Sequence, residues 1–137
     1  MNYIVALRYF LIMAIMLLFT GIWIFMLHTS LSIDGTRDYY ALKSFFGLLE
    51  TVSPHLFGMS LLIFILTHFF AIIKDAKKKK DHTLFTLFFI VMLLANISGF
   101  FIEESDIFYT KIKLTSTLVF VAYSFFIIYK LFKISAN

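Results

Sequence analysis

Four long apolar runs constrain what this chain can fold into more than any other feature of its sequence. They span residues 9–27, 56–73, 83–102 and 114–132. A helix needs about 20 apolar residues to cross the hydrocarbon core of a bilayer, and each run comes close to that length. None shows the apolar–polar alternation of a membrane barrel strand. The sequence therefore predicts an all-α polytopic membrane protein, a four-transmembrane-helix bundle in one domain over residues 1–137.

The composition agrees with lipid as the solvent for most of the surface. Of 137 residues, 61% are hydrophobic and 15% are charged, whereas a soluble domain carries about 25% charged residues. The chain has no cysteine, which excludes disulfides, thiolate metal sites and iron–sulfur clusters. Its net charge of +4 comes from residues that flank the apolar runs, so membrane orientation explains it and no nucleic-acid partner is expected.

The basic residues predict the orientation, because Lys and Arg concentrate in cytoplasmic loops. An N-in/C-in arrangement puts eight of them on the inner side and four on the outer side. The Lys-, Ile- and Phe-rich usage suggests an AT-rich bacterial genome, so we expect the inner membrane of a bacterium. The inner residues are Arg8, Lys74, Lys77, Lys78, Lys79, Lys80, Lys130 and Lys133, and the outer ones are Arg37, Lys43, Lys111 and Lys113.

A short amphipathic helix is predicted over residues 39–53, in the outer loop between the first two spans. Such a helix lies on the membrane surface with its apolar side in lipid. Pro54 follows it, at the start of the second apolar run, where a helix tolerates proline. The apolar residues that recur at helical spacing are Tyr39, Leu42, Phe45, Phe46, Leu49 and Val52.

Chemistry inside the membrane depends on four histidines, because no charged residue lies at mid-membrane. His28 closes the first run and His55 opens the second, both near the outer side. His68 lies five residues before the inner end of the second run, and His82 opens the third run. Each pair is matched in depth on neighbouring helices, and facing helices can hold haem between two imidazoles. We therefore expect one or two haem b groups, and no catalytic residues.

The second run also resembles a known family. Residues 53–58 read Ser-Pro-His-Leu-Phe-Gly, and His68 lies thirteen residues after His55. A helix ending in a small residue and Gly, then His-x-x-Gly and a second histidine, is similar to the cytochrome b subunits of nickel–iron hydrogenases and formate dehydrogenases. The similarity covers residues 20–73, with an echo at residues 98–99. It implies that His55 and His68 bind haem and that electrons pass between a quinone and a partner redox subunit.

One spacing departs from the related cytochromes b of bc complexes, whose paired histidines are 14 apart. Thirteen residues leave His55 and His68 about 140° apart around the helix, so they should face different helices. This agrees with pairing to His28 and His82 respectively.

A second function stays open from the same residues. Histidines at the membrane surface are often merely solvated, and a hydrogen bond to Ser60, Asn96 or Tyr123 would satisfy His68 without a metal. Small residues let helices approach one another closely. The alternative is a non-catalytic accessory or scaffold subunit, or a homo-oligomer, that packs through Gly21, Gly58 and Gly99.

Overall fold

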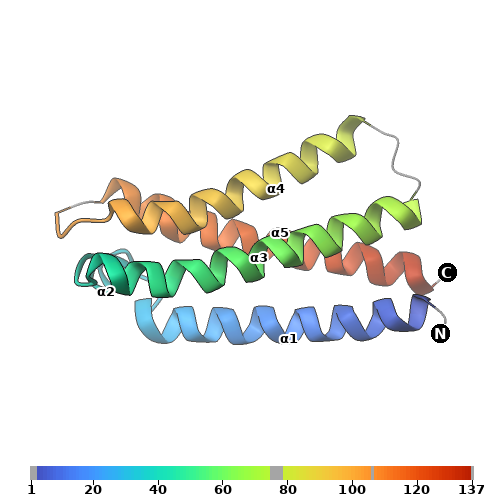
Figure 1. Ribbon diagram of the computed structural model, residues 1–137, viewed down its shortest axis with the longest axis horizontal. Helices are drawn as coiled ribbons and strands as arrows, with labels where there is room; N and C mark the ends of the chain where they lie inside the picture. The colour runs from blue at the N-terminus through green and yellow to red at the C-terminus, as the bar shows by residue number, and fades with distance from the viewer. Residues whose placement is uncertain (1–2, 75–78, 106, 137) are drawn as a thin grey trace.

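The computed structural model describes residues 3–74, 79–105 and 107–136, and every regular element in these ranges is a helix. Each of the four long helices contains a segment long and apolar enough to cross a membrane, so the chain forms the predicted four-helix membrane bundle. The elements are α1 (Tyr3–Thr29), α2 (Ile33–Ala41), α3 (Phe45–Lys74), α4 (Lys79–Ile97), the short 3₁₀ turn η1 (Ser98–Phe101) and α5 (Phe108–Ala136) (Figure 1).

The packing is centred on α5, which contacts every other element. In contrast, α1 packs on α2 and α5 and has few contacts with α3. Figure 1 shows both chain termini at one end of the bundle and α2 at the other. We call these the terminal end and the cap end. An even number of spans requires the termini to share a side, while the N-in orientation remains a prediction.

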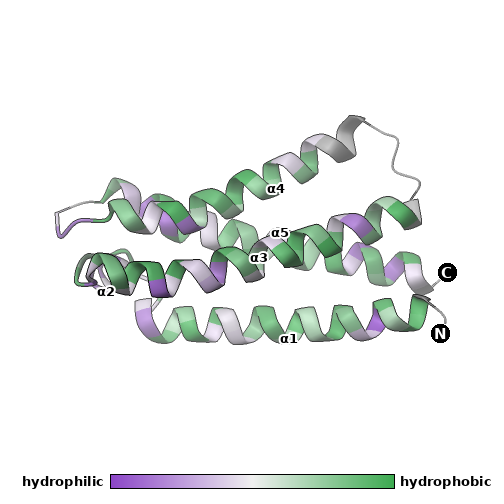
Figure 2. Ribbon diagram, in the orientation of Figure 1, coloured by the Kyte–Doolittle hydropathy of each residue, from purple (hydrophilic) through white to green (hydrophobic). Residues whose placement is uncertain are grey.

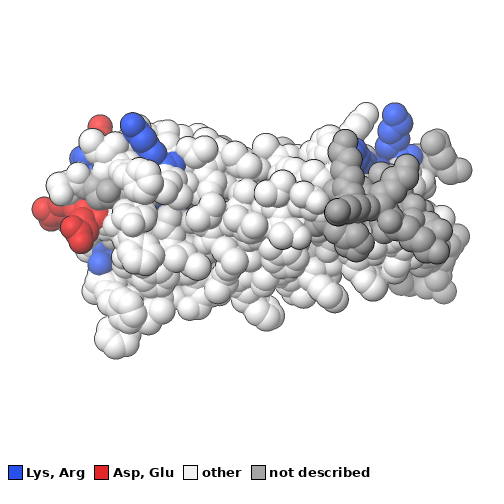
Figure 3. All heavy atoms as spheres, turned by 90° about the horizontal axis from the view of Figure 1, so that it is seen from above, with Lys and Arg blue, Asp and Glu red and all other residues white. Residues whose placement is uncertain are grey.

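The surface between the two ends is apolar. On the face seen in Figure 3, Lys and Arg lie at both ends and Asp and Glu at the cap end, with a band free of all four between. Figure 2 shows hydrophobic residues along the middle of the helices. Large side chains such as Trp23 (61% exposed), Phe57 and Phe64 lie on this surface. Lipid therefore surrounds the band.

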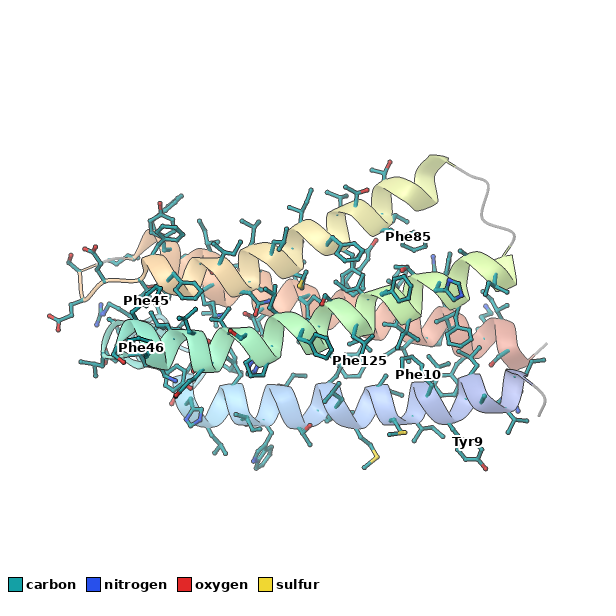
Figure 4. All side chains as sticks on the ribbon, viewed as in Figure 1. Tyr9, Phe10, Phe45, Phe46, Phe85 and Phe125 are labelled. Carbon is teal, nitrogen blue, oxygen red and sulfur yellow. The ribbon has the colours of Figure 1, made fainter. Side chains whose placement is uncertain are left out.

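Aromatic pairs hold the helices together across the bundle. On α1, Tyr9 points away from the bundle while Phe10 points inward (Figure 4). The ring centre of Phe10 lies 6.2 Å from that of Phe69 on α3, and Phe19 lies 5.5 Å from Phe125 on α5. The main core also includes Leu7, Leu11, Leu18, Leu62, Ile63, Leu66, Phe70, Phe88, Met92, Phe120, Ile127, Ile128 and Leu131.

A smaller cluster closes the cap end, where α2 folds back over the bundle. Ser30 and Leu31 both have left-handed backbone conformations, with φ of 51° and 50°, which reverse the chain after α1. The Ser32 hydroxyl then accepts a hydrogen bond from the Gly35 amide at 3.0 Å and caps α2. The buried members of this cluster are Tyr40, Leu48 and Ile102.

The helix expected over residues 39–53 is not a separate element, which corrects the sequence prediction. Residues 39–41 end α2, and α3 begins at Phe45. The Ser44 hydroxyl accepts a hydrogen bond from the Gly47 amide at 3.2 Å and caps α3 there. The apolar spacing continues across this turn, which is why the pattern alone indicated one helix.

Because α3 begins early, Pro54 lies inside it and not at its start. Proline has no N–H to donate to the carbonyl four residues earlier, here that of Glu50. In the same turn, the Nδ1 atom of His55 lies 2.7 Å from the Thr51 carbonyl oxygen and forms a hydrogen bond with it. The ring of His55 is thus fixed against its own helix beside the proline.

One long-range hydrogen bond joins the first and last helices at the terminal end. The Arg8 guanidinium donates to the Ser135 carbonyl at 2.6 Å. Arg8 is on α1 and Ser135 is near the end of α5, where the last carbonyls of a helix have no intrahelical donor. The bond therefore joins the start of α1 to the end of α5.

Candidate functional site

The candidate site is a cavity of about 330 Å³ in the half of the bundle nearer the cap end. It lies where α1 and α3 have few contacts, with α5 between them. Gly21 on α1 and Gly58 on α3 both line it, and a Cβ added to either glycine would meet nothing within 4 Å. The two glycines therefore leave open space where larger residues would fill the gap.

The cavity walls change character along the bundle axis. Toward the middle of the membrane they are apolar, formed by residues such as Leu17, Leu62 and Phe120. Toward the cap end the lining includes Tyr40, Thr51, His55, Asn96 and Lys113. A space with one polar and one apolar end fits a molecule of the same character.

Lys113 is the most unusual residue in this lining. Its side chain comes from the second turn of α5 and is only 6% exposed. Its ammonium donates a hydrogen bond to the Ala95 carbonyl and lies 4.7 Å from the centre of the Tyr40 ring, a cation–π distance. Neither contact supplies a negative charge, so a cation is held at the polar end by neutral groups.

A second lysine lies close to the opposite wall. The Lys43 ammonium donates to the Thr51 hydroxyl at 2.7 Å and lies 4.3 Å from the centre of the Tyr39 ring. Thr51 lines the cavity from α3. Its hydroxyl in turn donates to the Gly47 carbonyl at 2.8 Å, which fixes it on the helix. Positive charge is therefore present beside both α3 and α5.

The polar side chain that α4 contributes to the cavity lining, that of Asn96, is already engaged. Asn96 is 2% exposed, and its amide nitrogen donates to the Met92 carbonyl at 2.8 Å and to the Met59 sulfur at 3.3 Å. The Met59 contact links α4 to α3 across the cavity wall. Asn96 therefore contributes mainly to helix packing, which leaves Lys113 and His55 as the groups best placed to meet a ligand.

The four histidines predicted to bind haem lie in different surroundings. His55 is exposed at the edge of the cavity. The His28 ring stacks on Tyr39 of α2 with 4.7 Å between ring centres, and it does not line the cavity. His68 lies on the exposed surface of α3 beside Phe64, at 5.9 Å between ring centres. The side chain of His82 lies outside the described residues.

A bis-histidine haem needs two imidazoles that face each other across one cavity. The cavity has one histidine, His55, among its described lining residues. No group of three or more His, Asp or Glu side chains that could hold a metal occurs in the described part of the chain. His55 alone fits one side of a haem, and its predicted partner His28 does not line this cavity.

Within the described residues, His68 forms no hydrogen bond with Ser60, Asn96 or Tyr123, the three alternative partners considered for it, and each of these side chains donates to a backbone carbonyl. The Ser60 hydroxyl donates to the Phe57 carbonyl at 2.9 Å, and Asn96 is engaged as described. The Tyr123 hydroxyl reaches the Leu84 carbonyl at 3.5 Å. His68 makes ring contacts with Phe64 and Phe69 instead.

Lys113 was missed as a site residue because the apolar run was taken to begin at Leu114, which left this lysine in the outer loop. The helix in fact begins at Phe108. Residues seven apart lie on nearly the same face of a helix, and Lys113 is seven residues before the buried Phe120. Extending the buried stripe of α5 backward by two turns would have predicted a buried lysine.

Comparison with known proteins identifies a family. Residues 35–137 match the sequence model of a protein family described as a transmembrane helical domain. The matched range includes α3, α4 and α5, and most of α2. No curated protein and no solved structure matches the chain.

Proposed function

Because the chain belongs to a family of transmembrane helical domains, we propose that it is a small multi-pass membrane subunit that holds one amphiphilic molecule. The molecule occupies the cavity between α1, α3 and α5. The observation that carries the proposal is the division of the lining into an apolar part around Phe120 and a polar part around Lys113. The subunit binds and performs no bond-making chemistry of its own.

The side chains around the cavity support binding. The hydroxyl of Thr117 donates to the Lys113 carbonyl at 2.8 Å, and Thr20 donates to Met16 and Leu17 carbonyls. A hydroxyl engaged with its own backbone and without a neighbouring base is a poor nucleophile. These groups shape the walls, while Lys113 and His55 offer polar contacts to a bound molecule.

The test is a comparison of two leucine substitutions on the same helix. Gly58→Leu places a large side chain in the cavity, whereas Ala71→Leu adds the same side chain type at an exposed position near the other end of α3. Each purified protein is examined by native mass spectrometry in detergent after extraction from membranes. We expect a retained amphiphile on the wild-type and Ala71→Leu proteins and its loss from Gly58→Leu. Equal retention by both variants would rule the cavity out as the binding site.

The second candidate function is a b-type cytochrome subunit of an oxidoreductase that exchanges electrons with a quinone and a partner redox subunit. The observation that favours it is the hydrogen bond between His55 Nδ1 and the Thr51 carbonyl. Histidines that bind metal commonly donate their other ring N–H to such an acceptor, which leaves Nε2 free. Haem b would supply one-electron transfer when bound, and His55 would hold it on one side with Gly21 and Gly58 leaving room.

An absorption spectrum separates the two candidates. A haem-binding protein with two imidazole ligands is expected to show sharp α and β bands after reduction and a b-type pyridine haemochrome. His55→Ala should remove the haem near the cap end, while His68→Ala and His82→Ala test the predicted inner pair. A preparation from haem-replete cells with no Soret band would exclude the cytochrome and leave the amphiphile-binding subunit.

A further inference from the structure

We infer that the molecule in the cavity is an anionic phospholipid whose phosphate is bound by Lys113 and whose acyl chain lies between α1 and α3. This inference rests on the proposed function, since it names the class of amphiphile that the cavity takes. Three features carry it: the buried cation, its depth in the bundle and the apolar passage that leads away from it.

An anion beside the buried Lys113 ammonium would stabilise it. The salt bridges in the described part of the chain join Arg37 to Asp34 and Asp38, and Lys113 is not in one. Removing a charge from water is costly unless an opposite charge or several hydrogen bonds replace the water. An ammonium has three hydrogens to donate, and the Ala95 carbonyl accepts from it. A phosphate oxygen would supply both the missing charge and a further acceptor.

The depth of Lys113 suits a lipid headgroup. It lies five residues after Phe108, so about 7.5 Å along α5 from the start of that helix. This places its ammonium near the boundary between headgroups and acyl chains, where long cationic side chains normally reach toward lipid phosphates. A fully solvated surface lysine would instead lie outside the span.

A lipid is favoured over a soluble anion because of what closes the cap end. Tyr40, which is 5% exposed, lies beside the Lys113 ammonium. Beyond this cap the exposed side chains include the acids Glu103 and Glu104, which repel anions from the aqueous side. The other direction leads between α1 and α3, past Gly21 and Gly58, toward the apolar surface. An anion attached to an acyl chain can use that direction.

The charge on the opposite wall strengthens the assignment. Lys43 is held on Thr51, whose side chain belongs to the cavity lining. A phosphate at the polar end of the cavity would therefore lie in the field of two ammoniums, that of Lys113 on α5 and that of Lys43 in the turn between α2 and α3. The cavity lining continues along α5 from Lys113 to Val121, a rise of about 12 Å. Part of an acyl chain can therefore contact apolar side chains over this length.

The experiment titrates delipidated full-length protein in detergent with phosphatidylglycerol, phosphatidylcholine or oleate and counts the bound molecules by native mass spectrometry. We expect one phosphatidylglycerol per chain, bound about tenfold more tightly than phosphatidylcholine, whose choline cancels the phosphate charge. Lys113→Met should lower phosphatidylglycerol affinity about tenfold, and Lys113→Arg should retain it. Lys111→Met, which removes the same charge from an exposed position on α5, is the matched control and should bind as wild type.

The outcomes separate this inference from the proposed function. Equal affinity for both lipids, or wild-type affinity in Lys113→Met, would overturn the phosphate site while amphiphile binding stands. No bound amphiphile on any protein would overturn both. Tighter binding of oleate than of phosphatidylglycerol would show that a carboxylate, and not a phospholipid, is the occupant. The lipid comparison on the unaltered chain decides the question even if Lys113→Met does not fold.

Discussion

Gly99 lies so close to the ring of Tyr40 that a Cβ added to this glycine would be 3.1 Å from two of the ring carbons. The contact joins η1 to α2 at the cap end, and both residues are buried. The same tyrosine ring contacts the Lys113 ammonium. Close approach at Gly99 therefore sets the position of the ring that closes the cavity.

Gly99→Ala is expected to destabilise the protein by about 1 kcal/mol, because the added methyl group forces the Tyr40 ring to shift. Thermal unfolding in detergent, followed by circular dichroism, measures the loss. Gly21→Ala is the control, since its Cβ would meet nothing within 4 Å, and it should leave stability unchanged or slightly raised. Equal effects of the two substitutions would mean that the Gly99 contact does not constrain the cap.

Arg8→Gln is expected to loosen the terminal end, because it removes the charged donor that holds the Ser135 carbonyl. The cost should be about 1 kcal/mol. The chain has no cysteine, so spin labels on cysteines introduced at Val5 and Ile134 report on this end without interference. Their distance distribution should broaden in Arg8→Gln. It should stay narrow in Lys133→Gln, which removes an exposed charge from the same end.

The orientation follows from the excess of basic residues on one side of the membrane. Reporter fusions after Lys78 are expected to be active in the cytoplasm, and fusions after Asp38 or Ser105 on the opposite side. The test discriminates because all three junctions lie between spans. A cytoplasmic signal from the Asp38 fusion would invert the assignment and put the cap end, with the polar end of the cavity, on the inner side of the membrane.

The pKa of Tyr40 is raised above its ordinary value of 10.0, first by burial and second by the neighbouring Tyr39. The folded protein thus favours the neutral phenol, and this contribution to stability is complete below pH 10. It is lost as the pH rises above 10, because the unfolded chain releases the proton first. Tyr40→Phe should therefore show a shallower loss of unfolding free energy above pH 10 than the wild type. If the unfolding free energies of the two proteins fell in parallel above pH 10, the pKa of Tyr40 would not be raised in the folded protein.

Hydrophobic length alone was sufficient to predict the four spans, because lipid imposes that length on any crossing helix. The helix ends were harder to predict. Ser32 and Ser44 begin α2 and α3 through hydroxyl-to-backbone hydrogen bonds, and such caps cannot be distinguished from ordinary polar loop residues by hydropathy. Because of this error Pro54 was predicted at a helix start, whereas it lies inside α3.

The candidate site was predicted only in part. His55, Gly21 and Gly58 were selected from the sequence, and all three line the cavity. The haem-binding role of His55 and the packing role of the two glycines both stay predictions. Lys113 was assigned to a loop because charge was expected outside the span, and the tertiary contact with Tyr40 that accommodates it has no local sequence signal.

The central position of α5 has a consequence for biosynthesis. Helices enter the membrane in the order in which the ribosome makes them, and α5 is the last of the four spans in this sequence. Until it arrives, α1 lacks one of its two main packing partners and Arg8 lacks its acceptor. The nascent chain therefore passes through a stage in which three spans are inserted and α5 is not. At that stage the surfaces that later pack on α5 are exposed to chaperones and membrane proteases.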